Sequence, residues 1–314
     1  MPSIAVLGGL LTDYIITTPT FPRLGESLDG KSLFKHPGGK GGNVAVAAAR
    51  ARSSAGQEEV EQWHVKMLGA VGDDAEGKEL IDGLKKEGVD TTGVKVVKGE
   101  SSGICVVFLL GGEGDGGRGE SGNMAVPGAN AAFRLPIEGF LSPGTDLLCL
   151  NLAQISTSEV VLCAIQMASV AGVEVLLNPS PTAALEGIPT SRWCNPFITL
   201  LILNESEALA LSGTADWRDA AQAFLAMGVR NVLVTLGAQG AYFGTAEGED
   251  GVVKAEKLEP HEVVDTTGAG DAFAGAVAVE WVRGKNREGG ERMRRAVEVG
   301  CKAAAECVRR VGCR

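Results

Sequence analysis

The sequence predicts an α/β protein built on a doubly wound, mostly parallel sheet with helices on both faces, and a small additional β-sheet beside it. Short apolar runs of strand length alternate with helical patterns over most of the 314 residues. Glycine, at 44 residues, is about twice as frequent as usual, as expected for many tight strand-to-helix turns. The hydrophobic share of 45% is sufficient for the large core that such a sheet needs.

The elements follow in order along the chain. The first apolar run, residues 4–9, predicts a short buried strand, and the next segments predict a helix over 43–52, a strand over 65–71 and an amphipathic helix over 76–87. Further strands are expected at 103–110, 145–152, 173–177, 199–203 and 231–236, with helices at 158–171, 205–211 and 217–227. A last helix of small and apolar residues is expected over 272–282. Because strands and helices alternate, neighbouring strands are expected to be parallel.

Two stretches interrupt this alternation. Residues 12–37 contain Pro19, Pro22, Gly25 and Gly30 between short alternating runs, and residues 94–125 surround a glycine-rich loop. We predict that both contribute strands to a small separate sheet that acts as a lid. The whole chain, residues 1–314, is then one domain that carries this lid.

The composition argues against several classes of protein. The formal net charge of −10 disfavours nucleic acid and anionic membranes as partners. Seven cysteines without a Cys-x-x-Cys pair predict reduced thiols, and three histidines offer no zinc-binding spacing. The sequence shows neither a signal-peptide pattern nor a charge-free apolar run of about 18 residues. We therefore expect a cytoplasmic protein, with the nucleus as the alternative.

Residues 264–273 carry the strongest chemical signal. Gly268, Ala269 and Gly270 present backbone N–H groups at the start of a predicted helix, where the helix dipole favours an anion. Asp271 follows and is a candidate base for a hydroxyl group that attacks a phosphate. The alternative for this segment is an aspartate that only caps the helix.

A second glycine-rich segment, residues 37–43, also precedes a predicted helix. Its glycines allow close approach to a small ligand, Lys40 adds a positive charge, and Asn43 adds a donor and an acceptor. Asp13 lies just after the first strand, at the carboxyl edge where parallel sheets bind ligands. A plain glycine turn and a capping aspartate are the alternatives.

Two later segments suit a nucleotide. Asn204 and Glu207 follow the strand at 199–203, and their side chains suit water-mediated Mg²⁺ binding or, equally, a helix cap. Residues 235–240 form a strand-to-turn break whose glycines suit the border of a flat ring. A dinucleotide fold is disfavoured because no Gly-x-Gly-x-x-Gly follows a predicted strand.

Together these segments resemble the ribokinase (phosphofructokinase-B-type) family of sugar kinases in order and spacing. The resemblance extends from Val6 to Gly312 and rests mainly on residues 38–43 and 265–271, with supporting matches at 71–74, 127–130, 178–181 and 204–207. It implies a doubly wound α/β domain with a β-lid, ATP-dependent phosphorylation of a sugar, and a homodimer that pairs two lids.

The resemblance also implies roles for individual residues. Asp271 is implied as the catalytic base, with Gly268, Ala269 and Gly270 as the anion hole. The implied sugar contacts are Asp13, Gly39, Lys40, Gly41, Gly42, Asn43 and Gln154. The implied contacts of ATP and its Mg²⁺ ion are Asn204, Glu207, Thr235, Leu236, Gly237, Ala238, Gln239, Gly240, Gly270 and Cys301. A K⁺ ion is implied near Asp265, Thr267, Cys307, Arg310 and Gly312.

The sequence departs from the family pattern at three places. Leu11 replaces an asparagine, Gln154 replaces a glutamate, and the Pro-Ser segment that follows Gly312 in the family is missing, which predicts weaker activation by K⁺. The leading expectation is phosphorylation of D-ribose to D-ribose 5-phosphate. The alternatives are a related kinase for fructose, tagatose, deoxyribose or adenosine, and a non-catalytic sugar or nucleotide binder.

Overall fold

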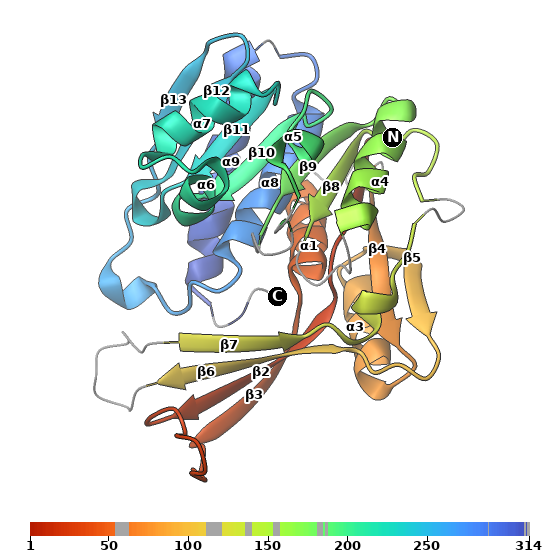
Figure 1. Ribbon diagram of the computed structural model, residues 1–314, viewed down its shortest axis with the longest axis vertical. Helices are drawn as coiled ribbons and strands as arrows, with labels where there is room; N and C mark the ends of the chain where they lie inside the picture. Colours follow the sequence, from red (N-terminus) through yellow and green to blue (C-terminus); the bar gives the residue numbers. More distant parts are fainter. Residues whose placement is uncertain are drawn as a thin grey trace.

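The computed structural model describes residues 1–53, 63–110, 121–135, 140–152, 158–180, 185, 188–287, 289–310 and 312. Within these residues, a nine-stranded sheet has the order β13-β12-β11-β10-β9-β8-β1-β4-β5, and a four-stranded sheet lies beside it (Figure 1). The larger sheet contains β1 (Ser3–Leu7), β4 (His64–Gly72), β5 (Asp90–Val97), β8 (Leu147–Asn151), β9 (Glu174–Asn178), β10 (Leu200–Asn204), β11 (Asn231–Thr235), β12 (Ala241–Thr245) and β13 (Asp250–Val253). Its pairings are parallel except where β12 joins β11 and β13, which confirms the predicted fold class.

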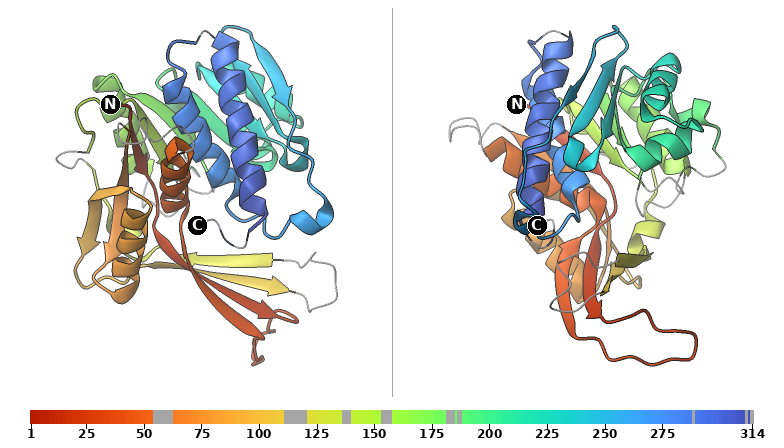
Figure 2. Two further views of the ribbon diagram at one scale, coloured as in Figure 1. Left: turned by 180° about the vertical axis from the view of Figure 1, so that it is seen from behind. Right: turned by 90° about the vertical axis from the view of Figure 1, so that its left-hand side faces the viewer.

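Helices cover both faces of the larger sheet. One core lies between the sheet and α1 (Lys40–Ser53), α3 (Ala75–Lys86), α8 (Ala269–Arg283) and α9 (Gly289–Val308). The other lies between the sheet and α4 (Ser158–Val170), α5 (Thr190–Trp193), α6 (Glu205–Ser212) and α7 (Trp217–Ala226). Strands β1 and β8 are buried along their whole length, which explains why they are apolar apart from Ser3 and Asn151 at their ends. The left-hand view of Figure 2 shows α8 and α9, both in blue, side by side over one face.

Glycine brings α8 close to its neighbouring helices. A Cβ atom on Gly275 would lie 2.6 Å from the Ala47 Cβ and 2.8 Å from the Val44 carbonyl oxygen of α1. A Cβ atom on Gly300 would lie 2.7 Å from Val277. Because no larger side chain fits at either position, the backbones of α1, α8 and α9 approach closely.

The smaller sheet contains β2 (Leu11–Thr18), β3 (Ser32–Gly38), β6 (Gly103–Leu110) and β7 (Ser121–Val126). Strands β2 and β6 are parallel, and the other pairs are antiparallel. The sheet lies across one end of the main body (Figure 1). The predicted lid stretch began too early, because residues 94–97 belong to β5 and pair with β4 in the larger sheet. An edge strand and a lid strand both show a half-exposed alternating pattern, so sequence periodicity did not separate them.

Two further differences concern the ends and number of helices. Helix α1 begins at Lys40 and α8 at Ala269, both three residues earlier than predicted, because glycines in the first turns conceal the start of a helix. The hairpin of β12 and β13 and the 20-residue helix α9 were not predicted. No helix of the described residues is long and apolar enough to cross a membrane.

Buried polar side chains attach the smaller sheet to the larger one. The Asn130 Nδ2 group donates to the Leu10 carbonyl at 2.8 Å, and its Oδ1 accepts from the Leu10 N–H at 3.0 Å. Asp74 caps α3 and also accepts hydrogen bonds from the Ser102 N–H and Oγ, both at 2.6 Å. These bonds fix the starts of β2 and β6 at the edge of the main body.

Candidate active site

A buried carboxylate lies where the first turns of α1 and α8 meet. The Asp271 side chain is 6% exposed, and its Oδ2 accepts a hydrogen bond from the Asn43 Nδ2 group at 2.9 Å. The Lys40 Nζ atom lies 3.8 Å from the other carboxylate oxygen. A buried carboxylate is costly unless it is paired, so both neighbours favour the charged form. The two signature segments, more than 200 residues apart, therefore form one site.

Asp271 is not the cap of α8. The capping position belongs to Gly268, which has a φ of 78° and no side-chain cap bond, whereas Asp271 lies in the first helical turn. Gly270 is exposed, and a Cβ atom there would meet no atom within 4 Å. Open space therefore adjoins the positive end of the helix, as an anion-binding turn requires.

The glycine-rich segment packs against the link between β1 and β2. Gly39 has a φ of 86°, and a Cβ atom there would lie 2.5 Å from the Gly9 carbonyl oxygen. A Cβ atom on Gly41 would overlap the backbone of Gly8, and the Gly42 N–H donates to the Gly9 carbonyl at 3.4 Å. These glycines are therefore required by the packing of the chain, whereas the sequence suggested only that they let a ligand approach closely. That packing holds Lys40 and Asn43 at the carboxyl edge of β1.

Asp13 lies on the smaller sheet, against the glycine-rich segment. Its carboxylate occupies the position that a Cβ atom on Gly38 would take. In register, Asp13 stands between His36 of β3 and Cys105 of β6, so the three share one face. Burial, and the nearby Asp13 charge, raise the pKa of Cys105 to about 11.

The predicted nucleotide residues lie at neighbouring strand ends. Asn204 and Glu207 form a capping box, in which the Asn204 Oδ1 accepts from the Glu207 N–H at 2.8 Å and a Glu207 oxygen accepts from the Asn204 N–H at 3.0 Å. The capping alternative is therefore confirmed for this pair. Thr235 lies opposite Asn204 in register, and its Oγ1 donates to the Leu203 carbonyl at 3.4 Å.

The turn at residues 235–240 follows β11 directly. It contains the short 3-10 helix η3 (Gly237–Gln239), preceded by Leu236 and followed by Gly240. A Cβ atom on Gly237 would meet nothing within 4 Å, whereas one on Gly240 would overlap the Val253 carbonyl. Gly240 is thus required by packing against β13, while Gly237 leaves open space beside the turn that includes Ala238 and Gln239.

Two predicted contacts lie elsewhere. Cys301 is 7% exposed and belongs to the core between α9 and the sheet, where burial raises the pKa of its thiol to about 11. Its thiol is a packing group rather than part of an open surface. Gln154 falls outside the described residues. Among the described residues, Cys105, Cys149, Cys163, Cys194 and Cys301 form no disulfide.

The residues of the predicted K⁺ site come together where α9 ends. The two Asp265 carboxylate oxygens accept hydrogen bonds from the N–H groups of Thr267 at 2.8 Å and Gly312 at 3.0 Å. The Cys307 Sγ lies 3.7 Å from the Thr267 carbonyl oxygen, and the Arg310 N–H donates to the Cys307 carbonyl at 3.1 Å. The Asp265 carboxylate thus organises this loop through backbone bonds.

Sequence reasoning missed a pattern at the carboxyl edge of the larger sheet. Four neighbouring strands each end in a polar residue on the face covered by α1 and α8, namely Asn151, Asn178, Asn204 and Thr235. Of these four residues, only Asn151 belongs to none of the motifs found in the sequence. The available signal was that each apolar run ends in asparagine or threonine.

Comparison with known proteins agrees with this site. The family model described as "pfkB family carbohydrate kinase" matches residues 1–314. A ribokinase of Schizosaccharomyces pombe is 36% identical, and the alignment covers 99% of this chain and 93% of the relative. A deoxyribokinase of Salmonella typhi is 33% identical, over 89% and 86% of the two chains. The structure of Arabidopsis thaliana ribokinase complexed with ribose and ATP is similar at a TM-score of 0.79 and 26% identity, covering 99% and 94%. The two signatures, the buried Asp271 and these similarities establish that the chain belongs to the pfkB family of carbohydrate kinases.

Proposed function

We propose that this kinase transfers the γ-phosphoryl group of ATP to the 5-hydroxyl group of D-ribose. The observation that carries the proposal is the Asp271 carboxylate, buried at the first turn of α8 and bound by Asn43. An oriented carboxylate at a helix N-terminus suits a reaction in which a hydroxyl group attacks a phosphate. The ribokinase relative and the ribose complex of the Arabidopsis ribokinase support ribose as the acceptor.

The proposed step is a single displacement. Asp271 takes the proton of the 5-hydroxyl group as its oxygen forms a bond to the γ-phosphorus, while the bond from that phosphorus to the β,γ-bridging oxygen breaks and ADP leaves. The N–H groups of Gly268 and Gly270 and the Lys40 ammonium group stabilise the transferring phosphoryl group. The Ala269 N–H, predicted to join them, donates to the Thr266 carbonyl at 3.3 Å. The smaller sheet brings Asp13 to the sugar and excludes water that competes as acceptor.

The kinase reaction requires a divalent metal ion such as Mg²⁺, which neutralises the ATP phosphates. We propose that Asn204 and Glu207 hold this ion through water, because they combine an amide with a half-exposed carboxylate at the edge of the sheet. Each of these side chains also has its capping bond, so only its remaining acceptor capacity serves the ion. The turn at residues 235–240 adjoins this pair and is the proposed position of the base.

The test is ADP release with Mg·ATP and D-ribose, with Asp271→Asn as the matched variant. Asn replaces the base with a side chain of the same shape, so we expect ribose binding to persist while kcat falls by about 10²–10⁴-fold. Turnover of the variant at the wild-type rate would exclude Asp271 as the base. Ribose-independent ADP release by the wild type would exclude the sugar as acceptor.

Deoxyribose is the second candidate acceptor. Leu11 replaces the asparagine of the family and is 3% exposed, so it offers no polar contact to a sugar hydroxyl group. The 33% identical deoxyribokinase also favours this candidate. Comparison of kcat/KM for ribose, 2-deoxyribose, fructose, tagatose and adenosine separates these acceptors, and a preference for 2-deoxyribose would replace ribose in the proposal.

We propose that the loop of Asp265, Thr267, Cys307, Arg310 and Gly312 responds to K⁺ only weakly. Both Asp265 oxygens already accept backbone hydrogen bonds, which leaves carbonyl oxygens as the main ligands. We expect similar initial rates in K⁺ and in Na⁺ at equal ionic strength. Strong stimulation by K⁺ would contradict this expectation.

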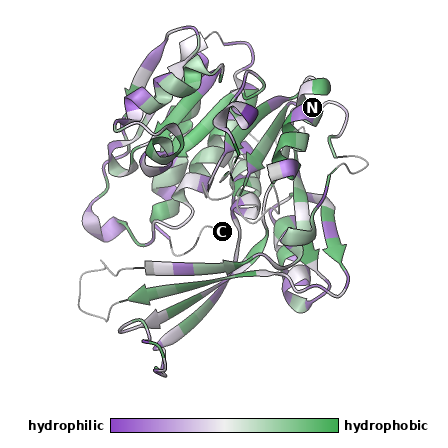
Figure 3. Cartoon of the chain, in the orientation of Figure 1, coloured by the Kyte–Doolittle hydropathy of each residue, from purple (hydrophilic) through white to green (hydrophobic). Residues whose placement is uncertain are grey.

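We propose that two smaller sheets pair in a homodimer. On the face opposite Asp13, Leu33, Met124 and Val126 are 62%, 67% and 52% exposed. Figure 3 shows hydrophobic residues in green among hydrophilic ones along β3 and β7, the strands that contain these three residues. An apolar sheet face of this kind favours a protein partner. Met124→Lys is expected to convert a dimer to a monomer in sedimentation velocity, and a wild-type monomer would refute the proposal. The described thiols of Cys105, Cys149, Cys163, Cys194 and Cys301 form no disulfide, and this favours a reducing compartment, either cytoplasm or nucleus.

A further inference from the structure

Two buried amide oxygens at the carboxyl edge of the larger sheet have no hydrogen-bond partner among the residues that the structure describes. Asn151 is 3% exposed, and among the described residues its Oδ1 is buried and unpaired. The Oδ1 atom of Asn178, at the end of the next strand, is likewise buried and unpaired within the described part of the chain. Buried acceptors are almost always paired, and leaving one unpaired costs about 1–3 kcal/mol. Two of them side by side indicate a ligand.

The two oxygens belong to one face of the sheet. Asn151 and Asn178 are opposite each other in the parallel pairing of β8 and β9, so their side chains point the same way. Cys149 and Leu176, two residues earlier in each strand, pack in the core beneath α1 and α8. The asparagines therefore point towards the side of the sheet on which Lys40, Asn43 and Asp271 lie.

The orientation of the Asn178 amide group is determined by its neighbour. Its Nδ2 group donates to the Ile202 carbonyl oxygen at 3.1 Å, and a carbonyl oxygen only accepts. The nitrogen therefore faces β10, and the oxygen is the atom left for another group. Exchange of the two atoms would place two acceptors against each other.

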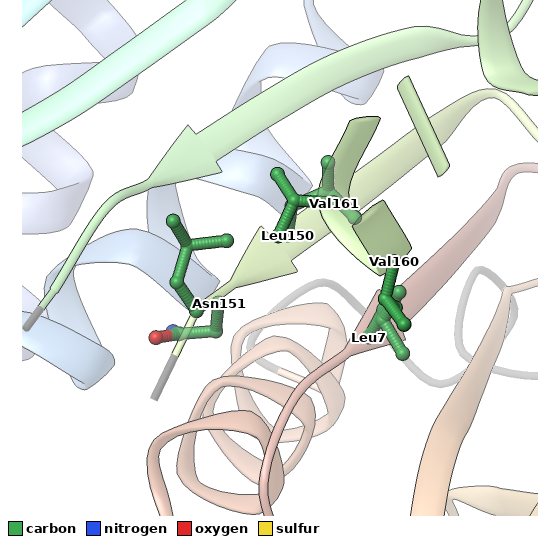
Figure 4. A pocket seen from close by; sticks show the side chains of 6 residues that line it. Leu7, Leu150, Asn151, Val160 and Val161 are labelled. Carbon is green, nitrogen blue, oxygen red and sulfur yellow. The ribbon is translucent and has the colours of Figure 1, made fainter. Parts of the chain in front are cut away.

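Asn151 adjoins the glycine-rich segment of the active site. A Cβ atom on Gly8 would lie 3.1 Å from the Asn151 Cβ on one side and would overlap Gly41 on the other. Gly41 stands in the first turn of α1, beside Lys40. Asn151 lines an apolar pocket together with Leu7 and Val160, and Figure 4 shows its carboxamide turned away from these two side chains. The amide is thus directed away from this apolar surface.

We infer that Asn151 and Asn178 accept hydrogen bonds from hydroxyl groups of the sugar, an inference that rests on the proposed function. Two amide oxygens accept and do not donate, so their ligand must supply hydrogen-bond donors or a cation, which an ionised phosphate oxygen or a carboxylate does not. The proposed metal site lies at Asn204 and Glu207, and the sugar supplies donors. Adjacent parallel strands lie about 4.8 Å apart, so two hydroxyl groups of one pentose can each donate to one of the two oxygens. These asparagines therefore distinguish pentoses that have both hydroxyl groups from those that lack one.

The test replaces Asn151 with leucine, which has a similar shape and removes the unpaired acceptor. Because no described residue pairs with this oxygen, we expect Asn151→Leu to keep or raise Tm. We expect the Kd for D-ribose in calorimetry without ATP to rise at least about tenfold. One of the two sugars 2-deoxyribose and 3-deoxyribose lacks the hydroxyl group that faces Asn151. For that sugar we expect Asn151→Leu to leave Kd unchanged.

Asn130→Leu is the matched control. Asn130 is 1% exposed, and its amide is fully engaged with the backbone of Leu10 and Pro127. This control is expected to lower Tm clearly, in contrast to Asn151→Leu. The inference would be overturned if Asn151→Leu weakened the binding of all three sugars equally or lowered Tm. It would also be overturned if the wild type bound no pentose. Pentose binding without ADP release would instead refute the proposed function and leave this inference intact.

Discussion

Substitution of Gly275 by alanine tests whether the close approach of α1 and α8 positions the base. The new methyl group would lie 2.6 Å from the Ala47 Cβ, whereas carbon atoms pack at about 3.5 Å or more, so the helices must separate by about 0.9 Å. Overpacking of this size costs about 1–3 kcal/mol, of which the better helix propensity of alanine offsets about 0.5–1 kcal/mol. We expect Tm to fall by several degrees.

The same separation acts on the active site. Gly275 lies one helical turn after Asp271, so the movement lengthens the 2.9 Å bond from Asn43 to Asp271. A misplacement of about 1 Å costs up to about 10²-fold in rate, and we expect kcat in the ribose assay to fall about 10- to 100-fold. Gly83→Ala is the matched control, because a Cβ atom there meets nothing within 4 Å, and it should gain stability and keep its kcat. A Gly275→Ala protein with the stability and kcat of the wild type would refute the reasoning.

Three further predictions concern single residues. Gly270→Ala should leave Tm unchanged or higher, because its methyl group meets no protein atom, but kcat/KM should fall at least about tenfold if phosphate lies against this turn. Lys40→Ala should lower kcat/KM by about 10- to 100-fold, and an unchanged value would remove Lys40 from the site. Burial raises the pKa of Asp74, but the hydrogen bonds from Ser102 and Gly77 outweigh it and hold this pKa below its usual value. Asp74→Ala should therefore destabilise the protein near neutral pH, and chemical denaturation should show this difference shrinking as the pH falls below about 4, where the unfolded wild-type chain binds a proton at Asp74 that the native carboxylate, with its lower pKa, does not yet bind.

The sequence determined the fold class and most of the elements, because strand runs and helical periods are local patterns. The runs at 103–110 and 158–171 are recovered as β6 and α4 almost without change. The same periodicity placed residues 94–97 in the smaller sheet, although they belong to β5 of the larger sheet. An edge strand of one sheet and a strand of another have the same half-exposed pattern. The starts of α1 and α8 were also displaced, because their first turns contain glycine.

The sequence also identified Asp271, Lys40 and Asn43 as separate candidates, since their residue types carry chemistry at glycine-rich helix starts. Only the tertiary structure decided that they meet, because Gly275 lets α1 and α8 approach and so brings Asn43 to Asp271. It likewise assigned Cys301 to the core and showed that Asn204 caps α6. Asn151 gained its place in the same way, since an unpaired buried oxygen is a property of the surroundings that packing creates and no linear motif records.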